Sequence, residues 1–228
     1  MKEMREPLKI LYEDNHCIAV VKPHGILTQG DDTGDRSLFD EVKDFIKERD
    51  QKPGNVFLGL VQRLDRPVGG VVVFAKTSKG AARLAEQFRV RETEKKYLAL
   101  VEGELKKKQG TVTQYLRKNH VTNTVEALDQ PTSEAQLAEL SYQVIKSIKQ
   151  NDRIFSLVAI EPKTGRSHQI RVAMSSLGTP IVGDKKYGSK VSRGGRIALC
   201  AVSLSFDQPV THERITVETE PDNEVFKI

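Results

Sequence analysis

The chain has 228 residues, of which 38% are hydrophobic and 29% are charged, so it can bury a core and wholesale disorder is excluded. No apolar run approaches the roughly 18 residues that a membrane-spanning helix needs, and the first residues lack the apolar centre of a signal peptide. Two scattered cysteines, Cys17 and Cys200, fit neither a disulfide framework nor a zinc site. We therefore expect a cytoplasmic protein with buried thiols and no membrane contact.

The net charge of +5 is unevenly distributed. Residues 1–50 carry 8 Lys/Arg against 12 Asp/Glu, whereas residues 163–196 carry 8 Lys/Arg against the single acid Asp184, a local surplus of seven positive charges (8 − 1). This asymmetry fits a polyanionic partner, of which nucleic acid is the commonest, but it equally fits a solvated basic surface.

In chain order, the first half predicts two strands, a loop, and then two helices separated by further strands. Ser37, with Asp40 three residues later, predicts the start of a helix that runs to Arg49, and Ser78 predicts the cap of the next helix. The predicted strands of this half are 8–12, 17–21, 57–61 and 71–75, and residues 62–70 form a loop. The acids and glycines of residues 30–35 do not match a calcium-binding loop, so no metal site is predicted.

The second half is dominated by strand patterns, at 95–103, 110–117, 122–128, 134–147, 153–161, 197–206 and 213–218. Apolar residues from Ile170 to Leu177 follow the helical period and predict a helix that Gly178 ends. The chain thus contains about ten strands and three helices without βαβ alternation. We predict an α+β fold with a mixed, largely antiparallel sheet, flanked by helices and loops, in a single domain spanning 1–228.

Three stretches carry candidate chemistry. The first is Arg63-Leu64-Asp65-Arg66-Pro67, where extended backbone directs Arg63 and Asp65 to one side and Leu64 to the other. A carboxylate between two guanidiniums is expected to stay ionised, which suits a nucleophile or an electrostatic stabiliser better than a general acid. By itself the stretch favours a loop salt bridge over an active site.

The second stretch runs from Lys163 to Arg171. We expect Arg166 at the start of a capped helix, where an arginine and the helix N-terminus together favour a phosphate or carboxylate. An exposed arginine on an amphipathic helix and a structural His168 are the simpler readings. The third is Tyr97, in a strand, which is either a core residue or a platform on which a nucleobase stacks.

Together these stretches resemble the RluA-type pseudouridine synthases. That family shows His-Arg-Leu-Asp-Arg-x-Thr-Ser-Gly, where this chain has residues 62–70, and Lys-x-Tyr-x-Ala-x-Val, where it has 95–101. Its Gly-Arg-x-His-Gln-Ile-Arg-Val and Pro-Ile-x-Gly-Asp-x-x-Tyr-Gly match residues 165–172 and 180–188. The opening 21–25 and the closing strand 199–206 are also similar, so the resemblance spans about residues 8–210.

The resemblance implies roles for individual residues. Asp65 matches the catalytic aspartate, Tyr97 the tyrosine that stacks on the target base, and Arg166 the arginine that pairs with the catalytic carboxylate. Leu199 falls at the aliphatic position packed against the uracil, and Arg63 matches the arginine that fills the gap left by the extruded nucleotide. Further RNA-binding candidates are Arg66, His168, Gln169, Arg171, Lys185 and Lys186.

This chain departs from the family motif at two places. Gln62 stands where the family usually has histidine, and Val68-Gly69-Gly70 replaces Thr-Ser-Gly. These departures concern loop hydrogen bonding and RNA register more than the reaction class. The family often carries an N-terminal S4 domain, and the match from residue 8 leaves no room for one. We therefore expect the catalytic domain to bind RNA itself, as a monomer.

The implied reaction breaks the N1–C1′ bond of uridine and makes a C5–C1′ bond, so it needs no redox cofactor or energy source. Neither a phosphate-binding loop motif nor a dinucleotide fingerprint is present. Asp65 could act at C1′, at C6 of the ring or on a sugar proton, and the sequence leaves these routes open.

The sequence leaves three other functions open: an RNA-binding protein of the same fold without catalysis, an RNA hydrolase that uses His168, and an enzyme acting on small anions that uses Arg166. We expect rRNA or tRNA as the partner.

Overall fold

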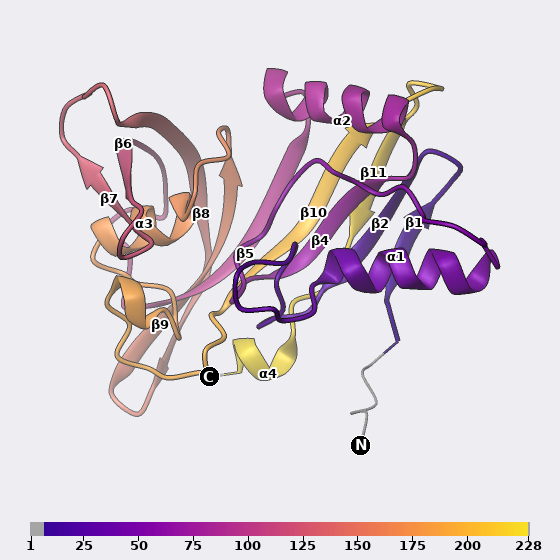
Figure 1. The fold of residues 1–228 in the computed structure, drawn as a ribbon. Coiled ribbons are helices and arrows are strands. Elements are labelled where there is room, and N and C mark those ends of the chain that lie inside the picture. The colour runs from indigo at the N-terminus through magenta and orange to yellow at the C-terminus, as the bar shows by residue number, and fades with distance from the viewer. Residues whose placement is uncertain (1–6, 228) are drawn as a thin grey trace. The chain divides into compact units, whose positions relative to one another are not determined.

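The computed structural model describes residues 7–227 and divides into two compact units (Figure 1). The first unit consists of the described residues up to Thr93 together with Ser203–Thr219, and the second of Glu94–Val202 with the described residues after Thr219. Within the described part there are eleven strands, four α-helices and one 3₁₀ turn. The predicted α+β class with mostly antiparallel pairing is confirmed, and only the short elements α4 and η1 were not foreseen.

The first unit holds a small sheet and two helices. Strand β2 lies between β1 and β4, β3 also pairs with β4, and β11 pairs with β10, all of them antiparallel. The elements of this unit are β1 (Ile10–Glu13), β2 (Cys17–Lys22), α1 (Leu38–Arg49), β3 (Gly59–Leu60), β4 (Gly69–Ala75), α2 (Ser78–Val90), β11 (Arg214–Glu218) and the last five residues of β10 (Leu199–Asp207).

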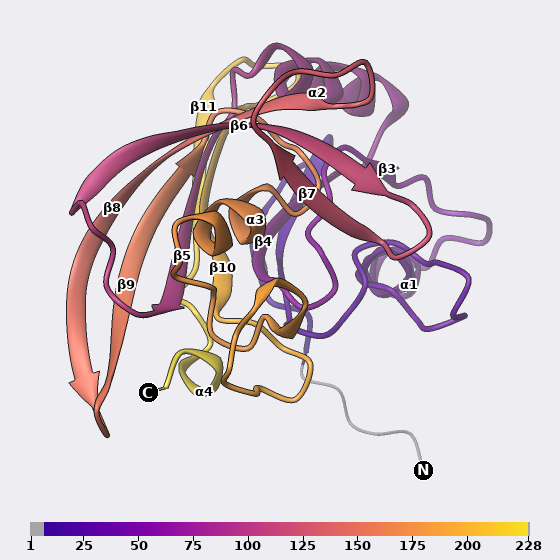
Figure 2. The same ribbon diagram turned by 90° about the vertical axis from the view of Figure 1, so that its left-hand side faces the viewer.

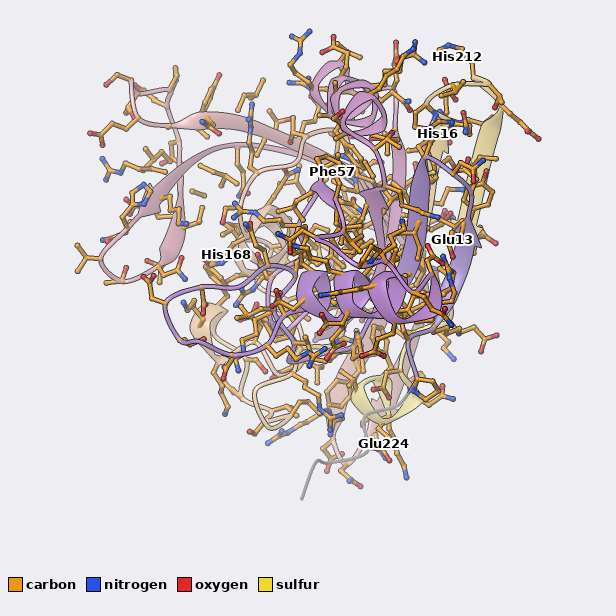
Figure 3. The ribbon with its side chains drawn as sticks, turned by 45° about the vertical axis from the view of Figure 1, so that its right-hand side comes forward. Glu13, His16, Phe57, His168, His212 and Glu224 are labelled. Atoms are coloured by element: carbon orange, nitrogen blue, oxygen red, sulfur yellow. The ribbon has the colours of Figure 1, made fainter. Side chains whose placement is uncertain are left out.

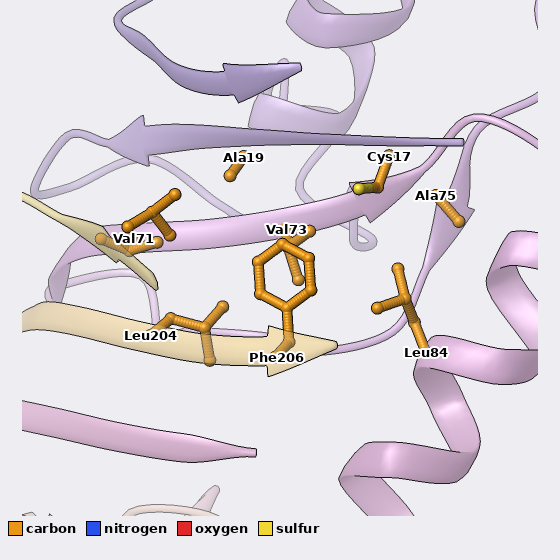
Figure 4. Packing of buried hydrophobic residues seen from close by; sticks show 9 residues of the cluster. Cys17, Ala19, Val71, Val73, Ala75, Leu84, Leu204 and Phe206 are labelled. Carbon is orange, nitrogen blue, oxygen red and sulfur yellow. The ribbon is translucent and has the colours of Figure 1, made fainter. Parts of the chain in front are cut away.

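Strands β2 and β4 are buried on both faces, which explains their unbroken apolar sequences. One face packs against Leu84 of α2 and Phe206 of β10 (Figure 4). On the other face the ring of Phe74 meets the ring of Phe39 in α1 edge to face, with centroids 6.0 Å apart. The fully buried residues of the first cluster are Cys17, Ala19, Val71, Val73, Ala75, Leu84, Leu204, Phe206 and Val217.

The helix α1 begins as predicted. Ser37 has extended backbone, its hydroxyl accepts the Asp40 N–H at 3.3 Å, and the Asp40 carboxylate accepts the Ser37 N–H at 3.0 Å, which is a complete capping box. For α2 the prediction was wrong by one residue. Thr77 is the cap, because its backbone is extended and its hydroxyl accepts the Gly80 N–H at 3.1 Å, whereas Ser78 is already helical.

The polar turn between β1 and β2 is held by carboxylates (Glu13 and His16 are labelled in Figure 3). Asp14 accepts the N–H groups of His16 at 2.7 Å and Cys17 at 2.8 Å, and the amide of Gln208 at 2.6 Å. Burial alone would raise the pKa of Asp14, but these hydrogen bonds outweigh it and lower the pKa. Burial raises the pKa of the Cys17 thiol to about 12, so this thiol stays protonated at neutral pH.

The second unit is built on a curved antiparallel sheet in the order β5-β9-β8-β6-β7 (Figure 2). Its elements are β5 (Glu94–Glu102), β6 (Gln109–Asn119), β7 (Thr124–Leu128), β8 (Gln136–Gln150), β9 (Arg153–Pro162), α3 (Gln169–Ser176), η1 (Lys185–Tyr187), the first four residues of β10, and α4 (Asn223–Phe226). Residues 7–227 include no helix that is long and apolar enough to cross a membrane.

Helix α3 lies against the hairpin of β6 and β7 (Figure 2). Four buried side chains form the contact: Leu116, Val125, Ala138 and Val172, with Tyr187 packed on them. The helix ends where predicted, since Gly178 takes a positive φ of 78° and the Gly178 N–H bonds the carbonyl of Ser175 at 2.9 Å. This small core fixes the hairpin to the segment that carries Arg166.

Candidate active site

Asp65 lies in the irregular segment between β3 and β4 of the first unit. Leu64 is buried and Arg63 is exposed, as the predicted alternation requires. The buried Thr28 holds Leu64 on both sides: its hydroxyl donates to the Leu64 carbonyl at 2.8 Å and accepts the Leu64 N–H at 3.1 Å. The residue before Asp65 is therefore fixed through its main chain.

The residue after Asp65 is fixed as well. The carbonyl of Arg66 accepts the Gly25 N–H at 2.9 Å and the ammonium group of Lys22 at 3.2 Å. Lys22 is fully buried, and its ammonium also donates to the carbonyls of Pro23 at 3.0 Å and Ile26 at 2.7 Å. Since isolated buried cations are costly, these three carbonyls explain how a lysine can lie there. The half-buried Asp65 is thus presented by a rigid turn.

The guanidinium of Arg66 contacts Gly25 and Asp35, which precede the Asp65 segment in the chain. Its Nε donates to the Gly25 carbonyl at 3.1 Å, and its Nη2 lies 2.7 Å from a carboxylate oxygen of Asp35. Both partners of this ion pair are about half exposed, so the pair contributes little stability. Asp35 belongs to the acidic turn that the sequence marked as a loop, and the structure gives that turn a basic partner.

The departure at Gly69 has a steric explanation. A Cβ at Gly69 would lie 2.5 Å from the imidazole of His24, whose Nδ1 lies 2.9 Å from the Pro67 carbonyl. His24 therefore occupies the space that a serine at residue 69 would need. Gly70 has φ of 121°, which explains why this residue is glycine. Gln62, the other departure, donates its amide to the Val71 carbonyl at 3.4 Å.

Arg166 lies in a turn that precedes α3 in the second unit, so the prediction that it starts the helix was wrong. The helix begins at Gln169, and its N-cap His168 has φ of 52° and makes no capping bond with its side chain. The Gln169 N–H bonds the Arg166 carbonyl at 3.2 Å instead. Arg166 Nε donates to the Leu137 carbonyl at 3.1 Å, which directs the side chain along that strand.

A buried glutamine holds this turn. The amide oxygen of Gln169 accepts the Arg166 N–H at 3.1 Å and the Thr164 hydroxyl at 2.6 Å, and its amide nitrogen donates to the Glu139 carbonyl at 2.9 Å. Thr164 also accepts the Glu139 N–H at 2.9 Å. Since Gln169 is only 5% exposed, these contacts favour a positioning role over direct RNA contact.

Arg171 is also buried. Its guanidinium bonds both carboxylate oxygens of Asp184, at 2.7 and 2.8 Å, and lies 4.9 Å from the ring centre of Tyr187. The side chains of Arg171 and Asp184 are 7% and 1% exposed, so each neutralises the other inside the core. We regard this pair as support for α3. His168, labelled in Figure 3, is partly exposed, and its Nδ1 lies 2.6 Å from the Tyr187 hydroxyl.

Tyr97 and Leu199 lie on strands of the second unit. Tyr97 is half-buried in β5, opposite Ile160 of β9, so part of its ring is accessible. Leu199 begins β10 and is 3% exposed, next to Ala198, whose carbonyl accepts the Leu100 N–H at 2.9 Å. An accessible aromatic ring and an aliphatic side chain are the features that a stacked nucleobase needs.

The basic stretch 163–196 keeps much of its positive charge, although several of its side chains form ion pairs or hydrogen bonds. Arg171 is neutralised by Asp184, and Lys163 lies 2.5 Å from a carboxylate oxygen of Glu139. Lys185 donates to the Lys190 carbonyl at 3.2 Å and Lys186 to the Asn123 carbonyl at 3.0 Å, which are neutral acceptors. Both lysines therefore still contribute positive charge at the surface.

A pocket of about 470 Å³ opens beside Arg166 within the second unit. Its lining combines cationic, polar and apolar groups: Leu116, Lys118, His120, Val125, Glu134, Gln136, Arg166 and Ser167. The hairpin residues Lys118 and His120 lie outside the sequence motifs and were not predicted. Thr28 and the supporting role of Lys22 were also missed, because a hydroxyl bonded to a residue 36 positions away leaves no local signal.

Comparison with known proteins agrees with this arrangement. Residues 16–176 match the family model described as RNA pseudouridylate synthase. The chain is 35% identical over 235 residues to tRNA pseudouridine synthase C of Haemophilus ducreyi, covering 95% of this chain and 92% of that protein. It is 34% identical over 216 residues to Ribosomal large subunit pseudouridine synthase C of Buchnera aphidicola subsp. Schizaphis graminum, covering 91% and 65%.

Among solved structures, Human RNA Pseudouridylate Synthase Domain Containing 4 superposes with a TM-score of 0.78 and 25% identity over 96% of this chain and 90% of that one. The chain therefore belongs to the RNA pseudouridine synthases, which are isomerases. Within that class it is of the RluA type, as its motifs predicted.

Proposed function

We propose that this chain converts specific uridines of tRNA or large-subunit rRNA to pseudouridine, with the carboxylate of Asp65 as the catalytic group. The observation that carries the proposal is the main-chain support of Asp65: Thr28 bonds Leu64 twice, and Lys22 and Gly25 bond the Arg66 carbonyl. Catalytic groups need such fixed geometry. Relatives named for tRNA and for the ribosomal large subunit support both RNA classes.

In the proposed reaction the N1–C1′ bond breaks, the uracil turns, and C5 bonds to C1′. C5 then loses its proton and N1 takes one up from solvent, so that the product is an isomer of the substrate. Cleavage develops positive charge on the sugar and negative charge on the uracil. An ionised Asp65 stabilises the sugar, bonds to C1′, attacks C6 of the ring or removes a sugar proton, and each of these routes needs the carboxylate deprotonated. Arg166 is proposed to pair with this carboxylate during the reaction.

Tyr97 is proposed to stack on the target base and Leu199 to pack against it, so that water is excluded while the uracil turns. Arg63, which is exposed, would fill the gap left by the extruded nucleotide. Arg66, His168, Lys185 and Lys186 are proposed to contact the RNA backbone. Gln169 and Arg171 are proposed to act indirectly, by holding the Arg166 turn and α3. We propose that the enzyme works as a monomer in the cytoplasm.

The test of catalysis is Asp65→Asn, which keeps the size of the side chain and removes its charge. Transcripts of tRNA and large-subunit rRNA labelled with tritium at C5 of uridine release tritium on conversion. We expect Asp65→Asn to bind these transcripts as the wild type does and to release no tritium. The matched control is Asp152→Asn in the exposed turn after β8, which should be fully active. Wild-type turnover by Asp65→Asn would refute the assignment.

The RNA class is tested by mapping pseudouridine with carbodiimide on the same two transcripts after incubation with the enzyme. Modification at defined positions in one transcript identifies the substrate. The affinity for RNA is expected to fall steeply with salt, because Lys and Arg contacts to phosphate release counterions. A flat salt dependence would argue against Lys185 and Lys186 as phosphate contacts.

A further inference from the structure

The short turn η1 holds the β6–β7 hairpin by two hydrogen bonds. The Lys186 ammonium donates to the carbonyl of Asn123 at 3.0 Å, and the Tyr187 hydroxyl accepts the N–H of Val125 at 2.9 Å. The Asn123 carbonyl and the Val125 N–H are both main-chain groups near the turn of the hairpin. The position of this turn of the hairpin is therefore set by η1, 62 to 63 residues away in the sequence.

Tyr187 is itself fixed to the helix that follows Arg166. Its hydroxyl lies 2.6 Å from His168 Nδ1, and the two rings meet edge to face with centroids 5.6 Å apart. The Tyr187 carbonyl accepts the hydroxyl of Ser175 at 2.8 Å, and the Arg171 guanidinium lies over the phenol ring. One hydroxyl thus bridges the N-cap of α3 and the main chain of β7.

The pocket beside Arg166 lies between these two bridged segments. The hairpin supplies Lys118, His120 and Val125, and the turn before α3 supplies Arg166 and Ser167. Val125 both lines this pocket and donates to Tyr187, so a shift of the hairpin changes the width of the pocket. Two cations, which outnumber the single carboxylate of Glu134, an imidazole and two apolar side chains match what a ribonucleotide offers: phosphate, hydroxyl groups and a base face.

We infer that Tyr187 is a positioning residue that holds the β6–β7 hairpin against the Arg166 turn, and so forms a pocket for an RNA nucleotide next to the target uridine. This inference rests on the proposed function. Arg166 Nε is held by the Leu137 carbonyl independently of Tyr187, so the chemical step should be little affected. The loss should fall on RNA binding.

The test is Tyr187→Phe, which keeps the ring over which Arg171 lies and removes only the hydroxyl. With the tritiated transcripts we expect KM for RNA to rise about fivefold, which corresponds to the loss of the one hydrogen bond between this hydroxyl and the hairpin, with kcat within about twofold of wild type. Tyr142→Phe is the matched control, since Tyr142 is a buried tyrosine of β8 outside the pocket, and it should change neither constant. Equal KM values for the two variants would overturn the inference.

A second measurement separates positioning from a general loss of structure. Lys118→Ala should raise KM for RNA. The double variant Lys118→Ala/Tyr187→Phe should raise KM by less than the product of the two single increases, because the displaced hairpin in Tyr187→Phe has already moved Lys118 away from the RNA. A product of independent effects would contradict the inference. Lys186→Met removes the other hairpin bond together with a proposed phosphate contact, so it should raise KM as well, and an unchanged KM would count against both roles of Lys186.

Failure of the proposed function is recognised separately. An active Asp65→Asn refutes the catalytic assignment whatever Tyr187→Phe does. An inactive Asp65→Asn combined with a wild-type KM for Tyr187→Phe refutes only the positioning role.

Discussion

The Asp65 loop of the first unit and the Arg166 turn of the second unit are rigid for different reasons. The Asp65 loop is held by a fully buried ammonium group, Lys22, that donates to three main-chain carbonyls. The Arg166 turn is held by a neutral buried amide, Gln169, while the buried cation behind it, Arg171, is neutralised by Asp184. The loop that carries Asp65 is thus supported by a buried positive charge, whereas the Arg166 turn is supported by a neutral amide.

Breaking the support of the Arg166 side should have the largest effect on stability. Arg171→Met leaves the Asp184 carboxylate, which is 1% exposed, without its partner, so the free energy of unfolding should fall by about 4 kcal/mol. Urea denaturation measures this loss. Arg89→Met, which removes an exposed ion pair with Glu86 on α2, should cost less than about 0.5 kcal/mol. Equal losses of unfolding free energy in Arg171→Met and Arg89→Met would show that the buried ion pair stabilises the fold no more than the exposed one.

Breaking the support of the Asp65 side should have the next largest effect. Lys22→Met leaves three carbonyls without this donor, and we expect the free energy of unfolding to fall by about 3 kcal/mol. Activity should fall further than the loss of stability explains, because Arg66 directly follows Asp65, the proposed catalytic residue. Lys47→Met on the exposed face of α1 is the control. Activity unchanged at a temperature well below unfolding would contradict the role given to Lys22.

A smaller effect is expected from restoring the family's residue beside the Asp65 loop. Gly69→Ser places a Cβ 2.5 Å from His24, so it should lower the free energy of unfolding by about 1–2 kcal/mol, as overpacking does. The double variant His24→Ala/Gly69→Ser should recover part of that loss in the same denaturation measurement. Gly54→Ser is the control, since a Cβ there meets nothing within 4 Å. A neutral Gly69→Ser would mean that His24 moves freely.

The smallest effect is the acid sensitivity of the first unit. A hydrogen bond from Arg49 lowers the pKa of Glu13, against the effect of burial and with help from Lys76. Its folded pKa lies below the ordinary 4.5, so its contribution is complete above pH 4.5 and is lost as pH falls through the folded value. Glu13→Gln should therefore be less stable than wild type by about 0.5 kcal/mol at pH 6, and the difference should shrink as the pH falls below 4.5. A difference that is constant with pH would contradict this.

Local signals predicted the elements well. The capping pair Ser37 and Asp40, the helical spacing from Ile170 and the closing Gly178 are contacts within a few residues, and each is confirmed. The cap of α2 was wrong because Thr77 and Ser78 are chemically alike, and only the backbone conformation decides between them. Arg166 was wrongly placed in α3 because the turn before the helix is held by β8, which lies some 25 residues earlier in the chain.

The amino-acid sequence by itself determined the reaction class, since Asp65, Tyr97 and Arg166 stand in motifs whose order and spacing are visible without a structure. It also determined the α+β class, because apolar periodicity is a local property. Only the tertiary structure decided what supports these residues: Thr28 on Leu64, Lys22 on Arg66, Gln169 on Arg166 and Tyr187 on the hairpin. Most of these contacts join residues 36 to 62 positions apart, and a hydrogen bond between distant residues leaves no pattern along the chain.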